Sequence, residues 1–237
     1  MRRQRSSLVS PVFCFLLACS SSAPTMHDAV EERRFDFAGG ALPGWAFGIA
    51  DFSDGTQPAN VVTSVQLAPS PFSGHALLLA GTNRSDDLMV YAKTRLTGLR
   101  PLQQYRVTGS VSVLTDVPSG CIGVGGAPGE SVWVVMAAAA EEPATVLQGG
   151  EYRLNLPRGN QGTSGPAGIV LGNLANTVAD CGPRRWERKS LSGGAEQSIV
   201  VSADREGRMW VVVGMDSGFE ATSQVFIQRF DLSLTSQ

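Results

Sequence analysis

The chain has 237 residues, a formal net charge of −2 and 43% hydrophobic residues, and only 17% of its residues are charged. This length is ample for one large hydrophobic core. The slight excess of acidic residues excludes the basic surface on which nucleic-acid binding depends, so no nucleic-acid partner is predicted.

The N-terminus carries a basic segment, then an apolar segment that ends in a cysteine. Residues 1–5 include three arginines, residues 8–18 are mostly apolar, and the tripeptide Leu16-Leu17-Ala18 precedes Cys19. This order is typical of an export signal, and it resembles the lipobox of bacterial lipoproteins. The resemblance implies that a diacylglyceryl group is attached to Cys19 and that residues 1–18, the lipoprotein signal peptide, are removed.

Two other interpretations of this segment are an ordinary secretory signal with a chance cysteine and a short transmembrane anchor. The apolar run is shorter than the about 20 residues that cross a ~30 Å hydrocarbon core, and Pro11 interrupts it. The prediction is therefore a protein held at the bacterial cell envelope by a lipid anchor. Ser20 after the cysteine resembles the pattern that directs lipoproteins to the outer membrane of Gram-negative bacteria.

Residues 19–34 are predicted to form a flexible tether, because they begin with small polar residues and contain Pro24. Removal of the signal takes three of the 19 basic residues and leaves 16 against 21 acidic ones. The predicted folded domain, residues 35–237, is therefore mildly acidic.

From residue 35 onward, short alternating or apolar runs are separated by glycine, proline, asparagine, aspartate and serine, which is typical of an all-β sandwich. The predicted strands are residues 35–37, 45–52, 61–67, 76–81, 88–96, 105–114, 121–124, 131–136, 152–156, 168–171, 186–191, 198–202, 209–215 and 224–234. The fold class is thus predicted as a single β-sandwich domain of jelly-roll type.

Three connecting segments have distinctive compositions. Residues 204–207 (Asp-Arg-Glu-Gly) predict a hairpin turn. Residues 125–129 and 159–165 are glycine-rich loops, and such loops often form binding surfaces. Residues 137–142 have a helical composition but are too few to define a fold.

Cys121 and Cys181 are the two cysteines that remain for the folded domain, since Cys14 lies in the signal and Cys19 is the lipidation site. Two cysteines in an exported domain predict a disulfide. The alternative is a pair of separate buried thiols.

Several segments resemble known families. Residues 35–37 (Phe-Asp-Phe), Gly44-Trp45, residues 96–101 leading into Tyr105, and residues 226–232 together resemble the jelly-roll domains of carbohydrate-binding modules. That resemblance implies that the first and last strands pair. Residues 83–88, 119–132 and 214–220 are similar to a family of uncharacterised exported bacterial lipoprotein-type proteins, which supplies no reaction to transfer.

The sequence contains little that indicates an enzyme. His75 is the single histidine of the predicted domain, which excludes a histidine-rich zinc site. No Gly-x-Ser-x-Gly elbow or phosphate-binding loop is present. The remaining route to catalysis is a carboxylate-dependent glycoside hydrolase, which would use two of Asp86, Asp87, Glu130, Asp216 and Glu220. Caps in turns, salt bridges to arginines such as Arg84 and simple exposure to solvent explain such residues better than catalysis does.

A structural calcium ion is the one cofactor that the sequence suggests. Carbohydrate-binding jelly rolls often hold such an ion near the paired terminal strands, and the resemblance therefore makes Asp36 and Asp231 candidate ligands. No Asp-x-Asp-x-Asp-Gly loop is present to support this hypothesis.

The predicted function is non-catalytic binding of a glycan or a cell-wall ligand. Sugar rings stack on exposed aromatic faces while carboxylates and amides bind the hydroxyls. Trp186, which has charged neighbours, is the candidate platform, and Asp86, Asp87, Asp216 and Glu220 are the candidate polar contacts. The alternative is an envelope lipoprotein that binds another protein or serves an architectural role.

Overall fold

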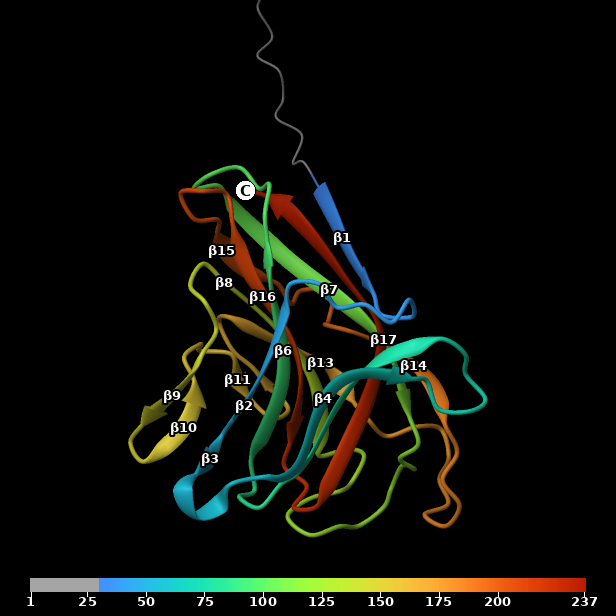
Figure 1. Cartoon of the computed structure of the whole chain (residues 1–237). Helices are drawn as coiled ribbons and strands as arrows, with labels where there is room; N and C mark the ends of the chain where they lie inside the picture. The colour runs from blue at the N-terminus through green and yellow to red at the C-terminus, as the bar shows by residue number, and fades with distance from the viewer. Residues whose placement is uncertain (1–29) are drawn as a thin grey trace, which may run out of the picture.

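Two antiparallel β-sheets pack face to face to form the molecule (Figure 1). The structure is a computed structural model and describes residues 30–237. Apart from a single turn of 3-10 helix, η1 (Asp54–Thr56), all regular elements in this range are strands. The predicted all-β sandwich is therefore confirmed. Within residues 30–237, no helix is long and apolar enough to cross a membrane.

The first sheet has seven strands and includes the two ends of the domain. Its strands lie in the order β14 (Glu187–Ser192), β7 (Gln104–Thr115), β17 (Thr222–Ser236), β5 (His75–Thr82) and β4 (Ala59–Leu67). In addition, β15 (Ile199–Ser202) pairs with β7, and β1 (Val30–Asp36) pairs with β17. The pairing of β1 with β17 confirms that the first and last strands are neighbours.

The second sheet has five strands and carries the candidate site. Its order is β13 (Gly168–Asn173), β8 (Val132–Ala139), β16 (Met209–Ser217), β6 (Leu88–Leu96) and β2 (Trp45–Ala50). Because side chains alternate between the two faces of a strand, each of these strands has an inner row that faces the seven-stranded sheet and an outer row that faces away from it.

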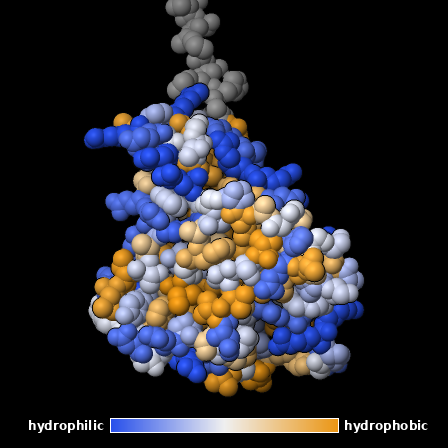
Figure 2. Space-filling view, in the orientation of Figure 1, coloured by the Kyte–Doolittle hydropathy of each residue, from blue (hydrophilic) through white to orange (hydrophobic). Residues whose placement is uncertain are grey.

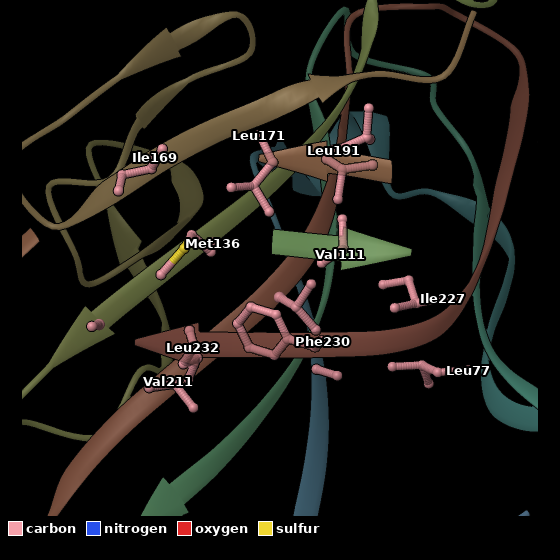
Figure 3. Close-up of a cluster of buried hydrophobic side chains, with 14 of the residues drawn as sticks. Leu77, Val111, Met136, Ile169, Leu171, Leu191, Val211, Ile227, Phe230 and Leu232 are labelled. Atoms are coloured by element: carbon pink, nitrogen blue, oxygen red, sulfur yellow. The ribbon is translucent and has the colours of Figure 1, made fainter. Parts of the chain in front are cut away.

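The main core lies between the two sheets. Leu77, Val111 and Phe230 of the seven-stranded sheet pack with Met136 and Val211 of the five-stranded sheet, and all five are at most 2% exposed (Figure 3). These residues come from strands far apart in the sequence, so burial of their apolar surface holds the two sheets together.

A pair of hairpins between β8 and β13 covers part of the outer face of the five-stranded sheet. The first consists of β9 (Thr145–Gln148) and β10 (Glu151–Leu154), and β10 also pairs with β3 (Phe52–Ser53). The second consists of β11 (Gly159–Asn160) and β12 (Thr163–Ser164). Leu154 packs on Met89 and Tyr91, which are buried outer-row residues of β6.

A separate apolar cluster lies on the outer face of the seven-stranded sheet. Leu78 and Phe226 project outward and are covered by Phe72 and by Trp186. The rings of Trp186 and Phe226 meet edge to face, with their centroids 5.3 Å apart. Trp186 is consequently half-buried and serves as a packing residue.

The disulfide between Cys121 and Cys181 is confirmed, with 5.7 Å between the two Cα atoms. It joins the loop after β7 to the loop after β13. The backbone amide of Ser119 also donates to the carbonyl of Val178, so a hydrogen bond supports the same junction.

Several predictions about the elements were wrong. Residues 121–124 form an irregular loop, because the disulfide holds this segment and Ile122 and Val124 are exposed. Residues 137–139 belong to β8, since the sheet buries these alanines. The turn at residues 204–207 joins β15 of one sheet to β16 of the other, so it connects two layers and does not form a hairpin.

The domain also begins earlier than predicted. β1 starts at Val30, so residues 30–34 of the predicted tether form a strand. Its side chains are exposed or half-buried, and backbone pairing to β17 holds it in place. Without an apolar row, the strand has no hydrophobic alternation by which a sequence pattern could detect it. The signal peptide and Cys19 lie outside the described residues.

Candidate functional site

Three aspartates converge at one end of the five-stranded sheet. Asp51 directly follows β2, Asp87 directly precedes β6, and Asp216 is the penultimate residue of β16. These strands are neighbours, and Met89 of β6 is paired with both Ala50 and Asp216. One carboxylate oxygen from each aspartate lies within 4.8 Å of the other two. Asp51, Asp87 and Asp216 are called the acidic cluster below.

Local backbone geometry helps to bring the cluster together. Asp51 has φ = 66° at the sharp bend between β2 and β3, and Asp86 has φ = 64° at the turn that enters β6. Aspartate is among the residues that adopt this left-handed conformation most readily. The hydroxyl of Ser85 donates to the backbone carbonyl of Asp87 (2.6 Å) and lies 3.3 Å from that of Asp51, which keeps the two turns close together.

Arg158 reaches into the acidic cluster from the loop between β10 and β11. Its guanidinium forms ion pairs with Asp51 and Asp216, and the side chains of these three residues are at most 5% exposed. The backbone amide of Gln161 also donates to Asp216 Oδ2 at 2.7 Å. The second hairpin is therefore attached to the sheet through buried charges.

The buried position of the cluster changes how its carboxyl groups titrate. Burial, together with the charges of Asp216 and Asp51, raises the pKa of Asp87 to about 8 against the opposing effect of Arg158. Burial likewise raises the pKa of Asp51, although Arg158 acts in the opposite direction. Arg158 thus limits the cost of placing several carboxylates together away from water.

A surface groove of about 490 Å³ opens beside the acidic cluster and is termed the groove. Asp51 and Arg158 lie at its inner side, and Arg153, whose side chain is 43% exposed, lies further out. The remaining lining is a mixture of amide and apolar side chains together with one glycine: Val146, Gln148, Leu154, Asn155, Leu156, Pro157, Gly159 and Asn160. The predicted glycine-rich loop at residues 159–165 therefore begins in the wall of a surface groove.

A smaller cavity of about 40 Å³ also adjoins Asp51. It is lined by polar side chains together with Phe52: Asp51, Ser53, Thr56, Ser85, Asp87, Glu151 and Arg153. Asp51 and Arg153 line both spaces.

The structure brings together only some of the predicted site residues. Asp87 and Asp216 meet in the acidic cluster, but the Asp86 side chain is exposed and contributes its backbone carbonyl to Gln161 instead. Glu220 is exposed in the loop after β16, where its amide donates to the carbonyl of Val124. Trp186 packs on the outer face of the other sheet. It therefore cannot share one small ligand with the cluster.

The candidate calcium ligands at the terminal strands are occupied by other groups. Asp231 accepts from Arg34 at 2.7 Å and from Arg229 at 2.6 Å, one through each carboxylate oxygen. Asp36 accepts from the backbone amide of Ala38. Two guanidinium groups supply the charge that a cation would supply, so these residues do not fit a calcium site.

Asp51 and Arg158, which organise the site, were not predicted. Asp51 lies within a predicted strand (residues 45–52), where a single carboxylate among apolar residues was the available signal. Arg158 stands between Pro157 and Gly159, and nothing in that tripeptide shows that its partners are 107 and 58 residues away.

The arrangement does not favour glycoside hydrolysis. A glycosidase needs two carboxyl groups on either side of the sugar bond. Of the acidic cluster, only Asp51 lines the groove, and it is paired with Arg158. Asp216 is 0% exposed. A ligand in the groove therefore meets one neutralised carboxylate.

No protein-family model matches the chain, and none of the curated proteins is similar to it. The resemblance to exported lipoprotein-type proteins accordingly stays a prediction.

Solved structures with a distant likeness do exist. One is the K3 cleaved adhesin domain of Lys-gingipain from Porphyromonas gingivalis, at 11% identity and a TM-score of 0.41, covering 86% of this chain and 99% of that one. Another is the family 11 carbohydrate-binding module of a cellulosomal cellulase from Clostridium thermocellum, at 12% identity and a TM-score of 0.39, covering 86% and 95%.

A third likeness is to carbohydrate-binding modules of the β-sandwich superfamily, at 12% identity and a TM-score of 0.39. It covers 82% of this chain, which spans 58% of the length of that protein. Identities and scores this low do not transfer a ligand or an activity.

Proposed function

We propose that this domain binds glycans without modifying them, and that the groove is the binding site. The observation that supports this most strongly is the chemistry of the lining: amide and guanidinium groups beside an apolar strip. Gln148, Arg153 and Asn160 offer hydrogen bonds to hydroxyl groups, and Val146 and Pro157 offer apolar contact to the C–H faces of a sugar ring.

The absence of a catalytic pair within reach of the groove favours binding over hydrolysis. Asp51 forms an ion pair with Arg158, and Asp216 is 0% exposed, so a ligand in the groove does not reach its carboxylate. The groove is lined mainly by the two inserted hairpins and the loop between them, together with Asp51 after β2. The second of these hairpins is attached to the sheet through the buried ion pairs of Arg158.

Binding would be tested with a glycan array that contains polysaccharides and peptidoglycan fragments, followed by calorimetric titration of each hit. We expect Arg153→Ala and Asn160→Ala to weaken binding about tenfold, because each removes a hydrogen-bonding group worth about 1–1.5 kcal/mol. Arg229→Ala is the matched control, since its side chain is exposed to a similar extent (48%) and pairs with Asp231 on the other sheet.

Two results would count against this function. One is a lack of binding across the whole array. The other is an equal effect of Arg153→Ala and Arg229→Ala, which would place the glycan outside the groove.

We further propose that the domain acts at the bacterial cell envelope, tethered by lipid on Cys19. The basic and apolar residues before Cys19 support this, and a doubly or triply acylated cysteine would give long-lived attachment. Mass spectrometry of the N-terminal peptide from the native host would detect the acyl groups. An unmodified Cys19, or a chain that retains residues 1–18, would contradict the anchor.

A protein-binding role is the second candidate, and one observation favours it. Ile122 is 99% exposed and Val124 is 65% exposed in the disulfide-linked loop. This loop lies at the end of the sandwich away from the start of β1, where apolar surface is visible (Figure 2). If the glycan array is negative, crosslinking from Ile122→Cys in whole cells would test for a protein partner at this loop.

A further inference from the structure

Two oxygens of the acidic cluster lack hydrogen-bond partners. Asp87 Oδ1 and Asp216 Oδ1 are both inaccessible to solvent and accept no hydrogen bond, and Asp216 as a whole is 0% exposed. Buried carboxylate oxygens ordinarily have a donor, because an unpaired one retains the full cost of its desolvation. A missing positive ligand would account for both oxygens.

The spacing of the three carboxylates matches the size of one cation. Calcium binds oxygens at about 2.3–2.6 Å, so any two oxygens that bind it lie at most about 4.6–5.2 Å apart. One oxygen from each of Asp51, Asp87 and Asp216 lies within 4.8 Å of the others. Magnesium demands a near-ideal octahedral shell, whereas calcium accepts the irregular geometry that three carboxylates from separate turns provide.

The balance of charges in the acidic cluster also favours a divalent cation. Three carboxylates face a single buried guanidinium, that of Arg158, which bonds through Asp51 Oδ2 and Asp216 Oδ2. Arg153 is partly exposed and lies 3.6 Å from Asp51 Oδ1. The guanidinium of Arg158 thus does not occupy the Oδ1 atom of Asp216, nor any oxygen of Asp87.

Additional oxygen ligands are at hand. The cavity of about 40 Å³ beside Asp51 and Asp87 is lined by the hydroxyl-bearing residues Ser53, Thr56 and Ser85. A water molecule needs a cavity of about 10–15 Å³, so this space is large enough for water. Calcium takes six to eight oxygens and accepts water among them. The cavity therefore supplies the part of the shell that three carboxylates leave open.

We propose that Asp51, Asp87 and Asp216 bind one calcium ion. The ion fixes the end of β2, the start of β6 and the end of β16, and through Asp216 it supports the hairpin held by Arg158 and Gln161. The site is structural, and it adjoins the groove through Asp51, whereas Asp87 and Asp216 do not line the groove.

Calcium binding would be measured on the chelator-treated protein by native mass spectrometry and by thermal unfolding, with calcium or magnesium added. We expect one calcium ion per chain, and a rise in melting temperature of about 5 °C or more at 100 times the Kd. Asp87→Asn and Asp216→Asn should each lose most of the calcium-dependent rise. Asp86→Asn is the matched control, because its carboxylate is exposed and next in sequence but outside the cluster.

Terbium luminescence gives a test that needs no variant at the ligands. Trp133 of β8 is the cross-strand partner of Asp216, and paired residues project from the same face of a sheet. Terbium bound at the cluster should therefore emit when tryptophan is excited, and calcium should displace it. Trp133→Phe should remove most of this emission, whereas Trp210→Phe should not.

Failure to bind calcium at millimolar concentration would overturn the proposal. Retention of calcium binding by both Asp87→Asn and Asp216→Asn, or terbium emission that Trp133→Phe leaves unchanged, would place the ion elsewhere. Equal affinity for magnesium would contradict the assignment to calcium. None of these outcomes depends on a glycan, so they are distinguishable from failure of the proposed function.

Discussion

Replacement of Arg158 by methionine is the sharpest test of how the site is held together. Arg158→Met keeps an unbranched side chain of similar length but removes the guanidinium that pairs with Asp51 and Asp216. The side chains of Arg158 and Asp51 are 5% exposed, and that of Asp216 is 0% exposed. The variant therefore leaves two buried carboxylates without their counter-ion.

The expected cost is large. Removing one partner of a buried ion pair destabilises a protein by about 3–5 kcal/mol, which is a substantial part of the about 5–15 kcal/mol that stabilises a folded domain. Arg153→Met is the matched control. Arg153 also approaches Asp51, but at 3.6 Å and with its side chain 43% exposed, so its loss should cost at most about 1 kcal/mol.

The loss should depend on pH. The charge of Arg158 lowers the pKa of Asp51 and of Asp87, against the effect of burial. Without this charge both pKa values rise further, so the native state of the variant binds more protons than that of the parent. Stability then falls more steeply as pH increases, and the difference from the parent should be greater at pH 8 than at pH 5.5.

Urea unfolding in the presence of a chelator, at pH 5.5 and pH 8, measures these differences without a cation replacing the lost charge. A loss below 1 kcal/mol for Arg158→Met, equal to that for Arg153→Met, would refute the view that buried charges attach the second hairpin. A greater loss at pH 5.5 than at pH 8 would refute the assigned sign.

Three further predictions concern stability. Asp87 keeps its proton in the folded state up to about pH 8 but loses it near pH 3.8 when unfolded. Without divalent cations, stability should therefore fall between these values by up to about 1.4 kcal/mol per pH unit. Asp87→Asn should flatten that slope in chelator-treated samples, and an unchanged slope would contradict the assignment. Cys121→Ser opens a disulfide that joins positions 60 residues apart, so it should cost up to about 4 kcal/mol in chain entropy. Calorimetric melting checks this, and an unaltered melting temperature would show that the bond contributes nothing. Phe230→Ala empties a 0% exposed position between the sheets and should cost about 3–5 kcal/mol. Urea midpoints compare it with Leu102→Ala at a 67% exposed position, and similar midpoints would contradict the assigned core.

The accuracy of the predicted strands follows the strength of their apolar pattern. β6 was predicted with both ends correct, at residues 88–96, because its apolar residues stand out from the polar turns around it. β1 was predicted to begin five residues late, since its half-buried and exposed side chains leave no such pattern. β9, β11 and β12 were missed for a similar reason, because all their residues are exposed or half-buried.

The candidate site was predicted only in part. Asp87 and Asp216 were singled out because they flank or end apolar strands, and the order of the sheet places them together. Glu220 and Trp186 carried the same kind of signal but lie elsewhere. A carboxylate or a tryptophan beside an apolar run shows where a strand ends, but not which neighbouring strand lies next to it.

The sequence by itself determined the all-β class, the prediction that the two cysteines pair, and the expectation of export from the basic and apolar N-terminus. These properties depend on local composition or on a count of residues. Only the tertiary structure decided that Asp51, Asp87, Asp216 and Arg158 meet. Their proximity depends on the order β16, β6 and β2 and on a hairpin that crosses over the sheet. Arg158 contacts partners that are 58 and 107 positions away in the sequence. The packing of the sheets fixes these contacts, and a local sequence pattern carries no information about that packing.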